Sequence, residues 1–185
     1  MKREKNIVLD IGKNNAKISV FDFNSNLKFS SKTKYPLYKI DELFIKDMNF
    51  LISWMKRKIY FINKKFAIDK IIVTTHGAAF GCIDKNHKKL FDVIDYENDL
   101  SIIDPIFDKI KPRYNDCYSP DSEKGLSIGK QLLYLKLNKK NVFKRIKYIL
   151  FLPQYINWIL TNKIFSELSY IGNHTHLWNF KRNNF

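Results

Sequence analysis

The sequence is poor in several residue types that mark common protein classes. It has only two cysteines among 185 residues, Cys82 and Cys117. This excludes a disulfide framework, and a reducing, cytoplasmic location is expected. The longest apolar run, residues 148–160, is interrupted by Pro153 and two amides and is too short to cross a bilayer. The N-terminus lacks the apolar core of a secretory signal, so we expect no membrane partner.

Arginine and acidic residues are also scarce. There are five arginines, and 18 acidic residues face 33 lysines and arginines, which gives a net charge of +15. Such a charge raises the alternative of a non-catalytic, basic nucleic-acid-binding module. Nucleic-acid interfaces favour arginine and clustered exposed aromatic side chains, and neither pattern is visible. The wealth of Lys, Asn, Ile, Phe and Tyr is typical of an A/T-rich coding sequence, so we expect no nucleic-acid partner.

The first third of the chain predicts strands followed by a helix. With 45% hydrophobic residues, the chain can form a core of useful size. β-type runs predict an antiparallel meander of three strands at residues 7–11, 17–23 and from 27 onward. Apolar residues at three- and four-residue steps predict a long amphipathic helix from Asp41 to Phe66, with Asp41 as its N-cap. Residues 70–75 are apolar on both faces, which predicts a buried parallel strand.

The remainder predicts a hairpin and then mainly helices. The hairpin covers residues 79–94, and a proline-containing loop follows with a short helix near 106–110. Further helices are expected at residues 126–137, at 142–152 and, opened by Pro153, through residue 160. No repeat or linker separates a second domain within the chain.

The segment DIGKNNAK, residues 10–17, carries the chemistry of greatest interest. A carboxylate ends the first strand, and a tight turn with Gly12 and other residues that tolerate positive φ would turn backbone N–H groups outward. Asp10 can hold Mg²⁺ or its waters, while the turn amides and Lys17 can contact phosphoryl oxygens. This is the division of tasks that phosphoryl transfer needs, although the same residues also suit an ordinary β-turn.

This segment resembles the N-terminal phosphate motif of the FGGY carbohydrate kinases. Blocks similar to that family follow in family order, and together they lie at residues 8–22, 74–80, 95–97, 125–132, 152–155 and 167–179. The details are most similar to the L-fuculokinase and rhamnulokinase branch. The resemblance implies an α/β, ribonuclease-H-like (actin-like ATPase) domain with a mixed sheet. It also implies a kinase that uses ATP and Mg²⁺ to phosphorylate a ketose such as L-fuculose or L-rhamnulose.

The resemblance also implies residue roles. The residues on the phosphate and metal side are Asp10, Gly12, Lys13, Asn14 and Lys17, with Asp10 reaching Mg²⁺ through water. The residues on the sugar side are His76, Gly77, Asp95 and Tyr96. A neutral imidazole both donates and accepts hydrogen bonds, which suits a polyhydroxylated ligand. An ordinary loop histidine and a charged turn are the alternatives for these sugar-side residues.

Two positions depart from the family pattern, and one histidine pair invites a metal hypothesis. Asn14 stands where the family usually has Thr, and His176 stands where Asp is common. His174 and His176 are two residues apart, but no third ligand follows at a suitable spacing, which disfavours a zinc site.

The family's catalytic Asp and its nucleotide-binding domain are expected beyond Phe185. Residues 1–185 are therefore expected to be an incomplete FGGY N-terminal, sugar-binding domain that contains no catalytic residue. Since domain closure aligns the phosphoryl group, we expect no turnover by this chain alone. A separately encoded second kinase domain could complete the enzyme. A sugar sensor of the same fold, without chemistry, is the remaining alternative.

Overall fold

The computed structural model describes residues 5–172 and 175–185. The chain divides into two compact units. The first unit comprises Met1–Tyr38 and Lys46–His76, and the second comprises Lys39–Ile45 and Gly77–Phe185. Each unit holds a β-sheet of its own.

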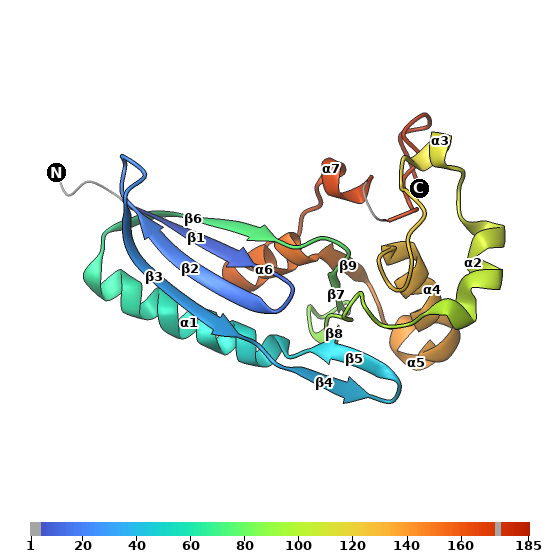
Figure 1. The fold of residues 1–185 in the computed structure, drawn as a ribbon, viewed down its shortest axis with the longest axis horizontal. Helices are drawn as coiled ribbons and strands as arrows, with labels where there is room; N and C mark the ends of the chain where they lie inside the picture. The colour runs from blue at the N-terminus through green and yellow to red at the C-terminus, as the bar shows by residue number, and fades with distance from the viewer. Residues whose placement is uncertain (1–4, 173–174) are drawn as a thin grey trace. The chain divides into compact units, whose positions relative to one another are not determined.

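A four-stranded sheet forms the first unit, with strand order β3-β2-β1-β6 (Figure 1). The strands are β1 (Lys5–Ile11), β2 (Asn15–Phe21), β3 (Leu27–Lys34) and β6 (Ile68–Thr75). Strands β1 to β3 form an antiparallel meander, and β6 pairs in parallel with β1. The predicted meander, the parallel strand and the mixed character of the sheet are confirmed.

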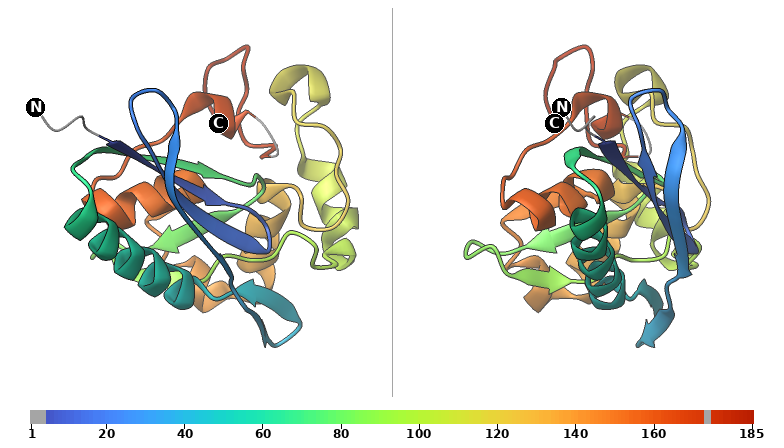
Figure 2. Two further views of the ribbon diagram at one scale, coloured as in Figure 1. Left: turned by 60° about the vertical axis from the view of Figure 1, so that its left-hand side comes forward. Right: turned by 90° about the vertical axis from the view of Figure 1, so that its left-hand side faces the viewer.

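One face of this sheet packs against helix α1 (Met48–Lys65), which lies along the sheet in Figure 2. Side chains alternate along β1, so Leu9 and Ile11 are buried whereas Asp10 between them is exposed. The helix contributes side chains that are at most 1% exposed, namely Met48, Leu51, Met55 and Ile62. Burial of each such side chain stabilises the fold by about 1.5–3 kcal/mol. This packing fixes β1 and leaves its polar residues on the other face.

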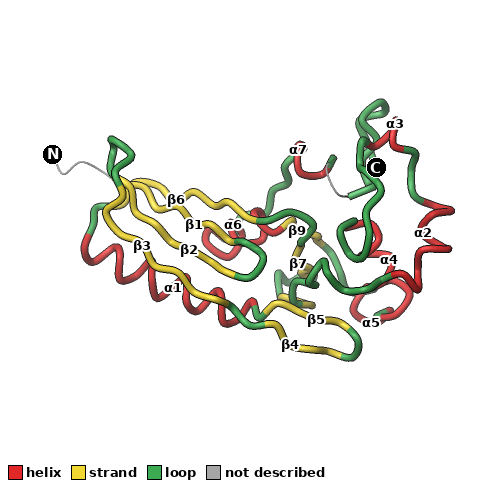
Figure 3. The backbone as a smooth tube through the Cα atoms, in the orientation of Figure 1, coloured by secondary structure: helices red, strands yellow, loops and turns green. Residues whose placement is uncertain are grey.

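The predicted start of α1 at Asp41 is wrong. Residues before the helix form a hairpin of β4 (Leu37–Ile40) and β5 (Leu43–Lys46), seen as strands in Figure 3. Asp41 lies in the hairpin turn with a left-handed φ of 52°. The true N-cap is Asp47, whose Oδ1 accepts a hydrogen bond from Phe50 N at 2.8 Å. Both aspartates precede apolar residues, so the local sequence pattern could not show which of them is the N-cap of α1.

Strand β6 is less buried than predicted. It lies at the edge of the sheet, and Ile72 is 50% exposed. Ile72 pairs with Val8, and Thr74 pairs with Asp10. These residues share the face that points away from α1. An apolar run on both faces of the strand therefore did not guarantee burial on both faces.

The second unit contains the sheet β8-β7-β9. Its strands are β7 (Phe80–Ile83), β8 (Lys89–Phe91) and β9 (Tyr148–Phe151). The β7–β8 hairpin agrees with the prediction. The continuous helix predicted over 142–152 is wrong, because α5 (Lys140–Phe143) ends early and β9 occupies residues 148–151. β9 pairs with β7 from Phe80–Phe151 to Ile83–Tyr148, so distant backbone pairing overrides the helical spacing of apolar residues.

Helices make up most of the rest of the second unit. They are η1 (Ser101–Ile103), α2 (Asp104–Ile110), α3 (Tyr114–Cys117), α4 (Ile128–Asn138), α6 (Leu152–Thr161) and α7 (Leu168–Ile171). As predicted, Pro153 lies in the first turn of α6. Gly81 in β7 permits a close approach, because an added Cβ would lie 2.3 Å from the Tyr155 ring. Within the described residues, no helix has the length and apolarity needed to span a membrane.

Candidate functional site

A row of polar side chains crosses the first-unit sheet near the end of β1. Asp10 pairs with Thr74 of β6 on one side and with Lys17 of β2 on the other, and Lys17 pairs with Lys32 of β3. All four residues are exposed. Paired residues point to the same face of a sheet, and antiparallel neighbours have Cβ atoms about 4.5–5.5 Å apart. This polar row places a carboxylate between a hydroxyl and an ammonium group.

Within the described residues, the charges of Asp10 and Lys17 are not paired with another side chain. Neither Asp10 nor Lys17 forms an ion pair with another residue in the described part of the chain. Their side chains can therefore bind a ligand without first breaking a contact within the protein. An exposed carboxylate beside an exposed ammonium group suits a ligand that carries both a metal ion and phosphate.

The turn between β1 and β2 lies directly beyond the polar row. Gly12 N donates to Asn15 O at 2.9 Å, which closes the turn around Lys13 and Asn14. These residues tolerate positive φ, but none from 12 to 15 adopts it. The turn leaves little space at Gly12, where an added Cβ would lie 3.3 Å from Asn15 O. The orientation of the turn amides must therefore have a cause other than left-handed backbone.

His76 lies beside this turn. Its backbone N donates to Ile11 O at 2.9 Å, one step beyond the Ile11–Thr75 pair of the parallel strands. Its side chain is half-buried. The first unit thus brings together six of the residues predicted from the sequence, namely Asp10, Gly12, Lys13, Asn14, Lys17 and His76.

Two residues that the sequence did not single out also contact the turn. The Tyr35 hydroxyl donates to Gly12 O at 2.7 Å, and Lys46 Nζ donates to Lys13 O at 2.7 Å. Both side chains are buried. They lie 23 and 33 positions from their acceptors, so no short-range pattern in the sequence points to them.

The other predicted sugar-side residues, Gly77, Asp95 and Tyr96, belong to the second unit. Asp95 is buried, and its Oδ1 accepts a hydrogen bond from Glu97 N at 2.8 Å. This contact forms an Asx turn, so one carboxylate oxygen of Asp95 is committed to local structure. Tyr96 O accepts from Gly125 N at 2.9 Å. The backbone of both residues is held by contacts within the second unit.

Gln131 of α4 connects the segments around these residues. Its buried Nε2 donates to Ala78 O at 2.9 Å and also to Gly125 O. Ala78, next to Gly77, has a left-handed φ of 53°. Gly125 approaches Tyr96 closely, since an added Cβ would lie 3.1 Å from Tyr96 O. One amide side chain therefore fixes the backbone next to two predicted sugar-side residues.

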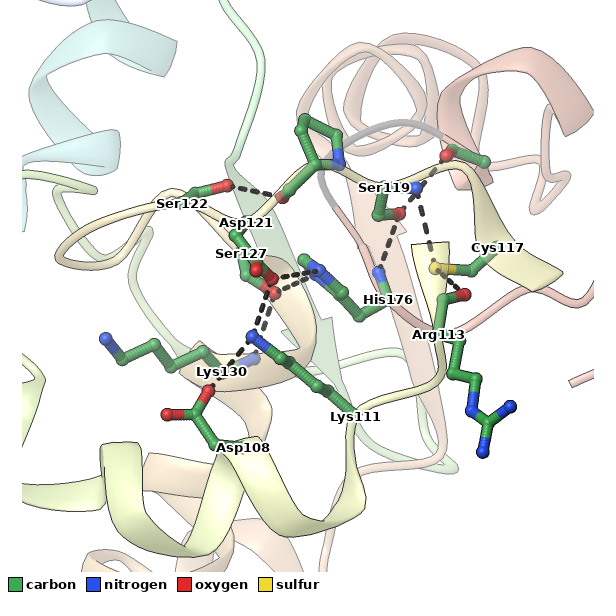
Figure 4. Close-up of polar contacts among 12 residues, drawn as sticks. Asp108, Lys111, Arg113, Cys117, Ser119, Asp121, Ser122, Ser127, Lys130 and His176 are labelled. Atoms are coloured by element: carbon green, nitrogen blue, oxygen red, sulfur yellow. Dashed lines mark hydrogen bonds and ion pairs between the residues drawn. The ribbon is translucent and has the colours of Figure 1, made fainter. Parts of the chain in front are cut away.

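A second group of charged residues lines a cavity of about 410 Å³ in the second unit. Figure 4 shows most of their side chains and the polar contacts among them. We call this group the charged cluster, and its members are Asp104, Asp108, Lys111, Asp121, Lys130 and His176. Lys111 Nζ lies 3.0 Å from Asp108 Oδ1 and 2.6 Å from Asp121 Oδ1, and Lys130 pairs with Asp104. The hydrogen bond from Lys111 lowers the pKa of Asp121, and the bond to Asp121 raises the pKa of Lys111.

Of the histidine pair considered from the sequence, the structure describes only His176. His174 lies outside the described residues. His176 is buried, and its Nδ1 lies 2.9 Å from Ser127 Oγ. No three metal-ligating side chains converge anywhere in residues 5–172 and 175–185. His176 therefore contributes to a hydrogen-bonded network in the second unit.

Comparison with solved structures shows that several carbohydrate kinases contain a region with this fold. A carbohydrate kinase from Novosphingobium aromaticivorans is 23% identical, with a TM-score of 0.90 over 100% of this chain and 39% of that one. The ligand-bound xylulose kinase from Lactobacillus acidophilus is 18% identical, with a TM-score of 0.81 over 98% of this chain and 38% of that one. Plasmodium falciparum glycerol kinase with ADP is 15% identical, with a TM-score of 0.78, and 98% and 39% of the two chains are covered.

Sequence comparison gives the family. No curated protein matches the sequence. The family profile described as the N-terminal domain of the FGGY family of carbohydrate kinases matches residues 6–185. This match covers both units, and the mixed sheet agrees with the fold of the solved kinases. The chain belongs to the FGGY family of carbohydrate kinases, in the N-terminal domain.

Proposed function

We propose that this chain is the sugar-binding part of an ATP-dependent carbohydrate kinase. The whole enzyme transfers the γ-phosphoryl group of ATP to a sugar hydroxyl. Family membership supports the reaction class. One observation carries the proposal for this chain: the polar row and the β1–β2 turn lie next to each other at the carboxyl ends of β1 and β6.

Asp10 is the residue that fits a magnesium ion. Mg²⁺ prefers oxygen ligands and keeps several of its waters, so one exposed carboxylate is enough to hold it beside phosphate. Asp10 is exposed, has no ion pair to break among the described residues, and shares its row with the Thr74 hydroxyl. When bound, Mg²⁺ supplies charge neutralisation of the phosphates. In this proposal, Asp10 orients the hydrated ion through its waters.

Lys17 and the turn supply donors to the phosphoryl oxygens. The Lys17 ammonium is exposed directly beside Asp10. Charge-assisted hydrogen bonds from such a group are about twice as strong as neutral ones. The backbone amides of Lys13 and Asn14 add further N–H donors. Asn14 brings a side-chain amide where the family usually has a Thr hydroxyl, so this chain forms one phosphate contact differently.

The sugar is assigned to His76, Gly77, Asp95 and Tyr96. His76 follows the parallel strand directly, and its ring can exchange hydrogen bonds with several hydroxyl groups. We propose a ketose such as L-fuculose or L-rhamnulose as the acceptor. Two of the solved relatives named above are a xylulose kinase and a glycerol kinase, which supports a polyhydroxylated substrate as the general class.

No residue of this chain is assigned as the catalytic base. The chain spans 38–39% of the length of the solved kinases described above. We propose that the base comes from the remaining part of the N-terminal domain and that a second kinase domain, which could be separately encoded, supplies the adenine-nucleotide site. Residues 1–185 then form an incomplete domain that binds sugar and phosphate but has no turnover alone.

Calorimetry and an ADP-release assay test this proposal. The chain is titrated with a panel of ketoses and with glycerol, with and without MgATP, and the same mixtures are assayed for ADP. We expect saturable binding of at least one ketose and no ADP above the uncatalysed background. Failure of every polyol to bind would contradict the proposed substrate class. ADP release by residues 1–185 would contradict the proposal that they lack a catalytic group.

A further inference from the structure

Three consecutive carbonyl groups of the β1–β2 turn each accept a hydrogen bond from a different element. Ile11 O accepts from His76 N at 2.9 Å, Gly12 O from the Tyr35 hydroxyl at 2.7 Å, and Lys13 O from Lys46 Nζ at 2.7 Å. The first bond continues the β1–β6 pairing. The other two come from side chains that belong to neither strand of the turn.

The base of the β4–β5 hairpin brings these two side chains to the turn. Tyr35 comes just before β4, and Lys46 ends β5. Asp47 N donates to Pro36 O at 3.0 Å, which joins the two ends of the hairpin. Tyr35 is 3% exposed and Lys46 is 0% exposed, and Lys46 Nζ lies 5.5 Å from the centroid of the Tyr35 ring. A buried ammonium group needs polar partners, and Lys13 O is one of them.

The planar trans peptide converts these contacts into a direction for the turn amides. In each peptide unit, the carbonyl group and the following N–H point in opposite directions. No cis peptide bond occurs among the described residues. The peptide unit between Ile11 and Gly12 shows this rule. Its carbonyl oxygen accepts a hydrogen bond from His76 N on the β6 side, whereas its N–H donates to Asn15 O on the β2 side. When Tyr35 and Lys46 hold Gly12 O and Lys13 O, the N–H groups of Lys13 and Asn14 must point away from them.

We propose that Tyr35 and Lys46 are positioning residues for phosphate binding. They hold two carbonyls on the protein side of the turn, so the next two amides face outward at ordinary φ values. This inference rests on the proposed function, because it assumes that phosphate binds at the turn. It also explains how a turn without left-handed residues can present successive N–H donors, which the sequence alone could not show.

Inorganic phosphate titrations of the ¹⁵N-labelled chain test this inference. The amide signals of Lys13 and Asn14 give the Kd, and thermal unfolding of each variant gives its Tm. In Tyr35→Phe only one hydroxyl is lost, and we expect phosphate Kd to rise about fivefold. Lys46→Met removes a charged donor, and we expect a rise of about tenfold or more. Ile62→Val is the control. Ile62 is a buried residue of α1, and removing one of its methyl groups should lower Tm without changing any contact with the turn.

The outcomes separate the inference from the proposed function. Weaker phosphate binding in Tyr35→Phe and Lys46→Met, with unchanged Kd in Ile62→Val, supports the positioning role. Unchanged Kd in both turn variants overturns it while leaving phosphate binding by the wild type intact. If the Lys46→Met chain does not fold, the result for Tyr35→Phe decides. If wild-type Lys13 and Asn14 do not respond to phosphate, the proposed function fails and the inference fails with it.

Discussion

The polar row and the charged cluster are both rich in ionisable side chains, yet they differ in how those side chains are paired. Asp10 and Lys17 are register partners on one face, and neither forms an ion pair among the described residues. In the charged cluster, Lys111 bridges Asp108 and Asp121, and Lys130 pairs with Asp104. Charges already paired within the protein gain little from an added ion. The comparison indicates that the polar row can bind a ligand, whereas the charged cluster stabilises its own segment.

The largest expected effect comes from removing the ammonium group of the polar row. We expect Lys17→Met to raise the Kd for inorganic phosphate by about tenfold to a hundredfold, since a hydrogen bond to a charged group contributes about 1.5–3 kcal/mol. Lys111→Met is the matched control, because it deletes a lysine already bound to two carboxylates in the charged cluster. Phosphate titration followed by amide shifts measures both. An equal rise of the phosphate Kd in the two variants would contradict the claim that the polar row, and not the charged cluster, binds phosphate.

Alanine substitutions at Gly81 and Gly12 compare how much each unit of the chain loses in free energy of unfolding. An added Cβ at Gly81 meets the Tyr155 ring at 2.3 Å, whereas at Gly12 it meets only Asn15 O, at 3.3 Å. We expect Gly81→Ala to lower the free energy of unfolding by about 1–3 kcal/mol through overpacking. Gly12→Ala should cost less, because Gly12 does not use a positive φ. Urea denaturation of both variants measures the difference, and a larger loss for Gly12→Ala would show that the turn backbone is described wrongly.

The proposed contact of Asp10 with hydrated Mg²⁺ predicts a smaller effect. We expect Mg²⁺ to strengthen the binding of inorganic phosphate to the wild-type chain and to have no such effect on Asp10→Asn, because a neutral amide attracts the hydrated cation less. Calorimetric phosphate titrations with and without Mg²⁺ give the ratio of the two Kd values for each chain. Asp108→Asn, in the charged cluster, serves as the control that keeps the Mg²⁺ effect. An undiminished Mg²⁺ effect in Asp10→Asn would assign the metal to other groups.

The smallest expected effect concerns pH. Hydrogen bonding to Lys111 lowers the pKa of Asp121 in the folded chain. A carboxylate with a lowered pKa adds stability above its unfolded-state pKa, and that contribution is lost as the pH falls through the folded-state value. The effect on stability is small because the Asp121 side chain is 79% exposed. Carboxyl NMR titration should show the pKa of Asp121 rising toward its ordinary value in Lys111→Met, and an unchanged pKa would refute the pairing.

Short-range patterns in the sequence predicted the elements that depend on local interactions. Alternation gave the meander, apolar spacing gave the body of α1, and Pro153 marked the start of α6. The errors occur where distant contacts decide. β9 is a strand because it pairs with β7, and the start of α1 depends on the hairpin that places Asp47 as its N-cap.

The candidate site divides in the same way. The pairing of Asp10 with Lys17 could be predicted, because the short turn between β1 and β2 sets the register of the two strands. Family resemblance was needed to connect them with His76, since about 60 residues of chain separate that histidine from the turn. Tyr35 and Lys46 were missed because nothing near them in the sequence indicates that their side chains reach Gly12 O and Lys13 O.

The most direct test of the central claim is a map of amide shifts across the whole wild-type chain during titration with inorganic phosphate. Phosphate binding at the β1–β2 turn predicts saturable shifts concentrated at Lys13, Asn14 and Lys17, with little change at Lys111 and Lys130 of the charged cluster. Shifts centred on the charged cluster, or spread evenly over the lysine-rich surface, would contradict the claim that the turn is a phosphate site.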